Sequence, residues 1–131
     1  IGRLVKGAFA ESSRIAFSTR SEVAANYRKL AGMMLSDGAR RAGFYPVFAT
    51  HDAALIGDIV AIASRRGWRR EEYEFEMLFG VRRQLQEQLI RDGAQLRLYL
   101  PFGTDWWPYA VRRVGESPRN VTFLVRSLVG V

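Results

Sequence analysis

The chain has 131 residues, of which 48% are hydrophobic and 25% are charged, which suits one globular domain with its own core. It contains no cysteine and one histidine, which excludes a disulfide framework, a cysteine nucleophile and a multi-histidine metal site. The formal net charge of +7 comes from 18 Arg and 2 Lys against 13 acidic residues, and leaves nucleic acid, an acidic membrane surface or an anionic ligand open as partners.

The N-terminal third predicts a strand, a loop and a long helix. Residues 3–6 alternate in character and are predicted to form a strand, and Gly7 opens a loop in which the backbone can approach a ligand closely. A helix is expected over residues 22–41, with Ser21 as its N-cap. Its apolar side chains recur at helical spacing and would face inward: Val23, Tyr27, Leu30, Met34 and Leu35.

The next unit begins with a short apolar and aromatic run. Residues 44–50, FYPVFAT, are predicted to form the second strand, and Asp52 is a suitable N-cap for a helix over residues 53–66 that Gly67 ends. The side chains expected to face inward on this helix are Leu55, Ile56, Ile59, Val60 and Ile62.

The remaining chain repeats the same order. Strands are predicted over residues 73–78 and 96–100, separated by a helix over residues 81–92, and two further helices follow over residues 105–116 and 120–128. On the helix between the two strands, the side chains expected to face inward are Leu85, Leu89 and Ile90, and Gly93 is expected at the C′ position.

Strand and helix therefore alternate along the whole chain, which is typical of parallel βα units. A complete (β/α)₈ barrel needs about 250 residues, so four units with a terminal helix in 131 residues predict an α/β fold equal to half of one. A small open doubly wound sheet is the alternative. It gains no support from the dinucleotide-binding pattern, because no G-x-G-x-x-G follows any predicted strand.

One stretch, RLYLPFGTDWWPYAVRRVGE at residues 97–116, carries a candidate ligand site. Arg112 and Arg113 are neighbours on a predicted helix that follows a strand, and two such guanidinium groups can bind one carboxylate. Strand C-termini are where α/β sheets bind ligands. Paired arginines are also common on solvated helices, and a purely surface role for these two remains an alternative.

Four segments together resemble proline dehydrogenase, the FAD-dependent barrel enzyme that oxidises L-proline. They are RLVKGAF, YPVFATHD, YEFEMLFGV and RLYLPFG…PYAVRRVGE, and they occur in the family's order. The resemblance implies that residues 1–131 are one partial domain, the C-terminal half of the catalytic barrel. The chain lacks an initiator Met, which agrees with a fragment. The family's substrate lysine and an active-site aspartate would lie in the N-terminal half.

The resemblance also implies roles for individual residues. Arg3 matches a catalytic arginine near the flavin. The residues that match contacts to FAD are Arg3, Val5, Lys6, Gly7, Ala8, Arg20, Thr50, His51 and Glu116. The residues that match contacts to L-proline are Arg112 and Arg113 at the carboxylate, and Tyr99, Leu78 and Phe9 around the ring.

Three positions depart from the family's usual residues. Phe9 stands in place of a tyrosine, Arg20 in place of a lysine and Ala24 in place of an aspartate. No residue type required by the chemistry is lost at these three positions.

His51 is the one histidine of the chain and stands beside an expected N-cap. From the residues alone, a structural role for it is the simpler interpretation.

The resemblance implies further partners. A quinone is the expected electron acceptor, and the protein is expected to be cytoplasmic, with peripheral contact at the inner membrane face as an option. Nucleic acid is not expected, since the basic residues are scattered and no nucleic-acid motif appears. Three alternatives stay open: another flavin barrel such as a folate reductase, a basic nucleic-acid-binding module, and an incomplete fragment without activity.

Overall fold

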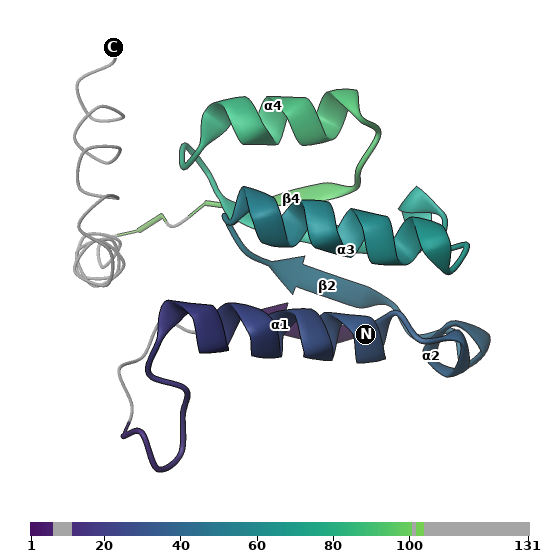
Figure 1. Cartoon of the computed structure of the whole chain (residues 1–131). Helices are drawn as coiled ribbons and strands as arrows, with labels where there is room; N and C mark the ends of the chain where they lie inside the picture. The colour runs from purple at the N-terminus through teal and green to yellow at the C-terminus, as the bar shows by residue number, and fades with distance from the viewer. Residues whose placement is uncertain (7–11, 101, 104–131) are drawn as a thin grey trace.

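The computed structural model describes residues 1–6, 12–100 and 102–103. Its centre is one sheet of four parallel strands in the order β1-β2-β3-β4 (Figure 1). The strands are β1 (Gly2–Val5), β2 (Pro46–Ala49), β3 (Glu74–Leu78) and β4 (Leu96–Tyr99). The four predicted strands are confirmed, each within a few residues of its expected bounds.

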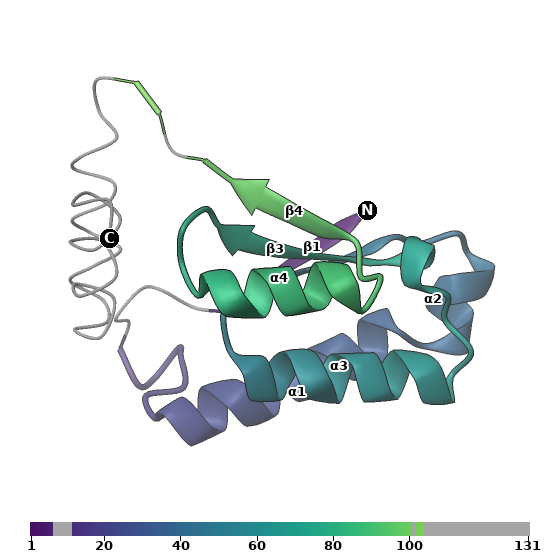
Figure 2. The ribbon, with the colours of Figure 1, turned by 90° about the horizontal axis from the view of Figure 1, so that it is seen from above.

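Helices α1, α3 and α4 lie together on one face of this sheet, and the short α2 lies beyond the N-terminal ends of the strands (Figure 2). The helices of the described part are α1 (Arg20–Met34), α2 (Asp37–Arg41), α3 (Ala53–Arg65) and α4 (Arg83–Arg91), with a single 3₁₀ turn η1 (Arg70–Glu72) before β3. The helices predicted over residues 105–116 and 120–128 lie outside the described residues.

The hydrophobic core fills the space between the sheet and the helices. Phe48 of β2 and Phe75 of β3 are completely buried, with ring centroids 6.1 Å apart, and Leu55 and Ile59 of α3 pack there equally buried. Each such side chain stabilises the fold by about 1.5–3 kcal/mol through the hydrophobic effect. The aromatic strand and the amphipathic helix predicted from the sequence thus form the centre of the core.

Two buried polar groups connect the layers. The Tyr27 hydroxyl of α1 donates to the carbonyl oxygen of Leu4 in β1 at 2.9 Å, and the indole Nε1 of Trp68 donates to the carbonyl oxygen of Leu35 at 2.9 Å. Burial raises the pKa of the Tyr27 phenol, so the hydroxyl stays protonated and able to donate. The first bond fixes α1 relative to β1, and the second fixes the C-terminal end of α1 relative to the segment that follows α3.

The single helix predicted over residues 22–41 is wrong in two respects. α1 begins earlier, because Thr19 and not Ser21 is the N-cap: its hydroxyl accepts from the Glu22 N–H at 3.2 Å, and the Glu22 carboxylate accepts from the Thr19 N–H at 3.1 Å. This reciprocal pair is a capping box. The helix also stops at Met34, since Ser36 caps a new helix, α2, through the N–H of Ala39.

The inward face of α4 also differs from the prediction. Leu89 is buried and Leu85 partly buried as expected, but Ile90 is 59% exposed and Gln86 is only 5% exposed. α4 starts at Arg83 rather than Val81, and its phase turns position 86 instead of position 90 toward the sheet. As a result, α4 buries a glutamine against the sheet.

Candidate active site

The sheet has one face that the described helices leave open, and several predicted site residues lie on it. In parallel strands, partners in register point to the same face. Arg3 pairs with Val47, which pairs with Glu74, and Leu78 pairs with Tyr99. The predicted residues Arg3, Val5, Leu78 and Tyr99 therefore share the face opposite the helices.

A charged network crosses this face between β1 and β4. The Nε of Arg3 donates to the Glu76 carboxylate, two strands away, over the short side chain of Ala49. On the other side, Arg97 donates to both carboxylate oxygens of Glu74 at 2.8 and 3.1 Å and lies 3.9 Å from Glu76. Among the described residues Glu76 is the only hydrogen-bond partner of the Arg3 side chain, so the terminal nitrogens of Arg3 are available to a ligand.

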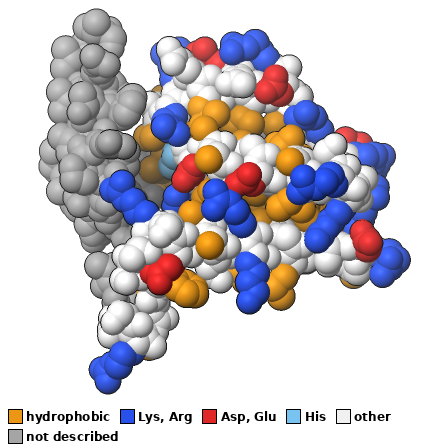
Figure 3. Space-filling view, viewed as in Figure 1, with side chains coloured by type: hydrophobic (Ala, Val, Ile, Leu, Met, Phe, Trp, Pro, Cys, Tyr) orange, Lys and Arg blue, Asp and Glu red, His pale blue; other side chains and the backbone are white. Residues whose placement is uncertain are grey.

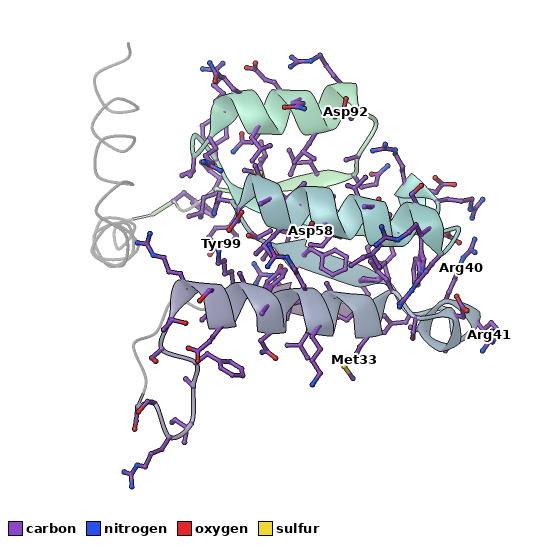
Figure 4. The ribbon with its side chains drawn as sticks, in the orientation of Figure 1. Met33, Arg40, Arg41, Asp58, Asp92 and Tyr99 are labelled. Atoms are coloured by element: carbon purple, nitrogen blue, oxygen red, sulfur yellow. The ribbon has the colours of Figure 1, made fainter. Side chains whose placement is uncertain are left out.

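Leu78 and Tyr99 form an apolar pair at the C-terminal ends of β3 and β4. Their Cα atoms are register partners, and Tyr99 is half exposed. Figure 4 shows Tyr99 near the end of the molecule where the strands finish, far from Arg40 and Arg41 at the opposite end. The pair therefore lies at the C-terminal ends of the strands, where (β/α) barrels bind their substrates.

His51 follows β2 and joins the same end of the sheet. Its Nε2 accepts a hydrogen bond from the main-chain N–H of Leu78 at 2.9 Å, and the guanidinium of Arg82 donates to the His51 carbonyl oxygen at 2.8 Å. Burial, and secondly the charge of Arg82, lower the pKa of His51. The ring is therefore neutral, and because Nε2 accepts, the proton sits on Nδ1. Nδ1 has no hydrogen-bond partner in the part of the chain that the structure describes.

Lys6, Thr50 and Asp52 form a second polar group at the ends of β1 and β2. Asp52 accepts from Lys6 Nζ at 2.7 Å, and its other oxygen caps α3 by accepting from the N–H groups of Ala54 at 3.1 Å and Leu55 at 3.4 Å. The Thr50 hydroxyl accepts from the Asp52 N–H at 3.1 Å. The hydrogen bond from Lys6 is the main reason why the pKa of Asp52 is lowered. Asp52 is confirmed as an N-cap, and its ion pair was not predicted.

Sequence reasoning missed three residues that support this site. Glu76 and Gln86 carried no visible signal, because an acidic residue in an alternating strand and a glutamine on a helix are both ordinary. Gln86 Nε2 donates to the carbonyl oxygens of Leu78 at 2.9 Å and Val81 at 2.7 Å. Arg82, with φ of 55°, adopts the left-handed conformation that residues other than glycine seldom take.

The remaining predicted residues fall into two groups. Arg20 is exposed at the first position of α1. It lies at the C-terminal edge of the sheet, because α1 runs back from the end of β1. The others lie outside the described residues and stay predictions: Gly7, Ala8, Phe9, Arg112, Arg113 and Glu116.

The helix-covered surface offers no comparable site within the described residues. Figure 3 shows Lys and Arg side chains spread over this face with acidic side chains among them. A shallow hollow there, between α1, α2 and the end of α3, includes Arg28, Met33 and Arg66 and none of the predicted site residues. Across residues 1–6, 12–100 and 102–103, no cluster of three His, Asp or Glu could hold a metal ion, and no helix is long and apolar enough to cross a membrane.

Parallel βα units with polar and apolar side chains collected at the strand C-termini define this chain as a partial (β/α) barrel. Comparison with known proteins agrees. The structure of proline utilization A from Bdellovibrio bacteriovorus inactivated by N-propargylglycine superimposes with a TM-score of 0.76 at 27% identity, over 86% of this chain and 13% of that one.

Sequence comparison identifies the family. The family model described as proline dehydrogenase matches residues 1–126. The proline dehydrogenase of Deinococcus radiodurans is 40% identical over 127 residues, 97% of this chain and 39% of that protein. Proline dehydrogenase 2 of Bacillus subtilis is 39% identical over 126 residues, 96% of this chain and 40% of that protein. The chain belongs to the proline dehydrogenase family, and it spans about two fifths of the length of these relatives.

Proposed function

We propose that this chain is the C-terminal half of the barrel of an FAD-dependent dehydrogenase that oxidises L-proline to 1-pyrroline-5-carboxylate. The observation that carries the proposal is the gathering of Arg3, Leu78 and Tyr99 on the open face of the sheet in a chain of this family. The Leu78–Tyr99 pair offers an apolar wall to a small ring, and Arg3 offers a cation on the same face of the sheet.

The described residues fit a flavin. A flavin presents ring nitrogens and carbonyl oxygens that need donors, and the site holds two donor groups without partners among the described residues: the Nδ1–H of His51 and the terminal nitrogens of Arg3. Arg20 adds positive charge at the same edge, which suits the phosphates of FAD, and Lys6 stands nearby in its ion pair with Asp52. When bound, FAD supplies the hydride acceptor for C5 of proline.

The protein's own part in this reaction is orientation and the exclusion of water. We assign Leu78 and Tyr99 to the wall around the proline ring, with Phe9 completing it. Arg112 and Arg113 are assigned to the carboxylate, whose planar shape suits a pair of guanidinium groups. Val5, Thr50, Gly7, Ala8 and Glu116 complete the assignment at the cofactor side.

The open face needs a cover. Arg3 keeps a side-chain exposure of 52% and Tyr99 is 50% exposed, whereas hydride transfer requires a site protected from water. We propose that the N-terminal half of the barrel, which would also bring the family's lysine and aspartate, pairs with the outer edges of β1 and β4. The acceptor that reoxidises the flavin is proposed to be a quinone, reached from the cytoplasmic face of the membrane, to which the net positive charge is suited.

The test uses the full-length product of the gene. Its visible spectrum is recorded without oxygen before and after addition of L-proline, with D-proline as the control. A flavin spectrum that bleaches with L-proline only supports the proposal. A flavin unaffected by L-proline would refute the substrate, and a colourless protein would refute the cofactor. Salt-dependent DNA binding by such a colourless protein would favour the nucleic-acid alternative instead.

A further inference from the structure

The main-chain N–H and carbonyl oxygen of Leu78, a residue of the apolar wall, are both hydrogen-bonded to side chains. Its N–H donates to the imidazole of His51 at 2.9 Å, and its carbonyl oxygen accepts from the amide of Gln86 at 2.9 Å. Both polar atoms of one peptide position are thus held by side chains, one from the end of β2 and one from α4. In a sheet these atoms ordinarily bond to neighbouring strands, so the last residue of β3 has a clamp of its own.

Gln86 also holds the turn that follows, together with Arg82. Gln86 Nε2 also donates to the carbonyl oxygen of Val81 at 2.7 Å, and Arg82 reaches back to the carbonyl oxygen of His51 at 2.8 Å. Arg82 keeps a positive φ of 55° in this turn. A non-glycine residue held in that conformation indicates a turn whose shape is imposed by its surroundings.

Gln86 is a costly residue for a helix to bury. It is 5% exposed on the face of α4 that packs against the sheet, beside the buried Leu89. An apolar side chain at this position would gain hydrophobic stabilisation, whereas an amide has to be fully hydrogen-bonded to avoid a penalty. Nothing about helix formation requires glutamine here, since Gln84 and Gln88 on the same helix are exposed. The specific property of Gln86 is its donation to two carbonyl oxygens at the end of β3.

We propose that Gln86 is a positioning residue for the substrate pocket: it fixes the end of β3 so that Leu78 stands against Tyr99 at the correct distance from the ring of a bound cyclic amino acid. The inference rests on the function proposed above, because Leu78 matters to the substrate only if that pocket binds proline. Gln86 touches neither proline nor flavin and acts through Leu78.

The test compares Gln86→Leu with Gln88→Leu in the full-length product of the gene. Gln86→Leu removes the donor and keeps the volume, and is expected to raise KM for L-proline about tenfold while kcat changes less than about threefold, since a buried hydrogen bond of this kind is worth roughly that factor. Hydrogen–deuterium exchange over residues 78–82 is expected to become faster. Gln88→Leu should change neither quantity.

A second measurement separates positioning from stability. Leu78→Ala truncates the wall directly and should raise KM as well. In that background Gln86→Leu should raise KM no further, because the residue through which it acts is gone. If Gln86→Leu does not fold, Gln86→Asn replaces it, since that amide is one methylene too short to reach both carbonyl oxygens.

Several outcomes would overturn the inference. Unchanged exchange over residues 78–82 would show that Gln86 does not hold the turn. Faster exchange with unchanged KM would make Gln86 a purely structural residue, and additive effects with Leu78→Ala would refute action through Leu78. A wild-type protein that does not oxidise proline refutes the proposed function separately, and the exchange result then still decides whether Gln86 holds Leu78.

Discussion

Asp52 combines two roles that one pair of substitutions can separate. One carboxylate oxygen caps α3 through two N–H groups, and the other accepts from Lys6 Nζ at 2.7 Å. Asp52→Ala removes both roles. Asp52→Asn keeps the cap, because Asn is as good an N-cap as Asp, and removes the charge that pairs with Lys6.

The expected costs follow from the exposure of these groups. Loss of an N-cap costs about 1 kcal/mol. The Lys6–Asp52 pair is about one third exposed on both sides, with side-chain exposures of 30% and 34%, so it is screened by water and is worth about 0.5 kcal/mol. Asp52→Ala should therefore destabilise the protein by about 1.5 kcal/mol and Asp52→Asn by about 0.5 kcal/mol.

Urea denaturation of the full-length product measures these differences. Asp58→Ala is the matched control, because Asp58 lies in the same helix and pairs with Arg28 but caps nothing; it should cost less than about 0.5 kcal/mol. Since the pKa of Asp52 is lowered in the folded protein, its contribution is present above pH 3.8 and is lost as the pH falls through the folded value. If Asp52→Asn costs as much as Asp52→Ala, the assignment of most of the energy to the cap is refuted.

Three further predictions concern other contacts. Because the pKa of His51 is lowered in the folded protein, the folded state binds this proton less tightly than the unfolded state, and the free energy of unfolding should fall as the pH drops below about 6.5. The variant His51→Gln keeps a hydrogen-bond acceptor and should flatten that part of the curve of stability against pH; an unchanged slope would contradict this. Tyr27→Phe leaves the buried carbonyl of Leu4 without its donor and should cost about 1–2 kcal/mol in urea denaturation, a value near zero counting against the bond. Glu76→Ala should lower proline turnover by releasing Arg3, and a double-mutant cycle with Arg3→Met should be non-additive, whereas additive losses would show that Glu76 acts independently.

The fold was largely predictable because its signals are local and repeated. The apolar run ending at Ala49 and the alternation before Leu78 have the two-residue period of strands, and Asp52 has the side chain that starts a helix. The break between α1 and α2 was missed for a physical reason. Ser36 is an unremarkable residue inside an apolar helical pattern until its hydroxyl binds a main-chain N–H, and the pattern alone does not reveal that competition.

The candidate site was predictable only as residue types at strand ends. Leu78 and Tyr99 were expected near one ligand, and their pairing in register places them side by side. The contact between Arg3 and Glu76 could not be foreseen, because it joins residues 73 positions apart across an intervening strand. Gln86 was missed because its burial depends on which side of α4 faces the sheet. The apolar residues of this helix are compatible with more than one inward face, so the sequence pattern does not determine it.

The open face of the sheet changes character from one end of the strands to the other. Near the N-terminal ends it carries Glu74 and Arg97, a pair joined by two hydrogen bonds, and at the C-terminal ends it carries Leu78 and Tyr99. Charges that satisfy one another create little net field for a ligand, whereas apolar groups at the mouth remove water from it and strengthen any nearby charge. Arg3 is level with Glu74 in the strand register, its guanidinium reaches Glu76, and its terminal nitrogens have no partner among the described residues. A guanidinium in that position is neutralised on one side by Glu76 and unsatisfied on the other, which is the arrangement expected of a residue that stabilises negative charge on a bound group rather than one that only supports the fold.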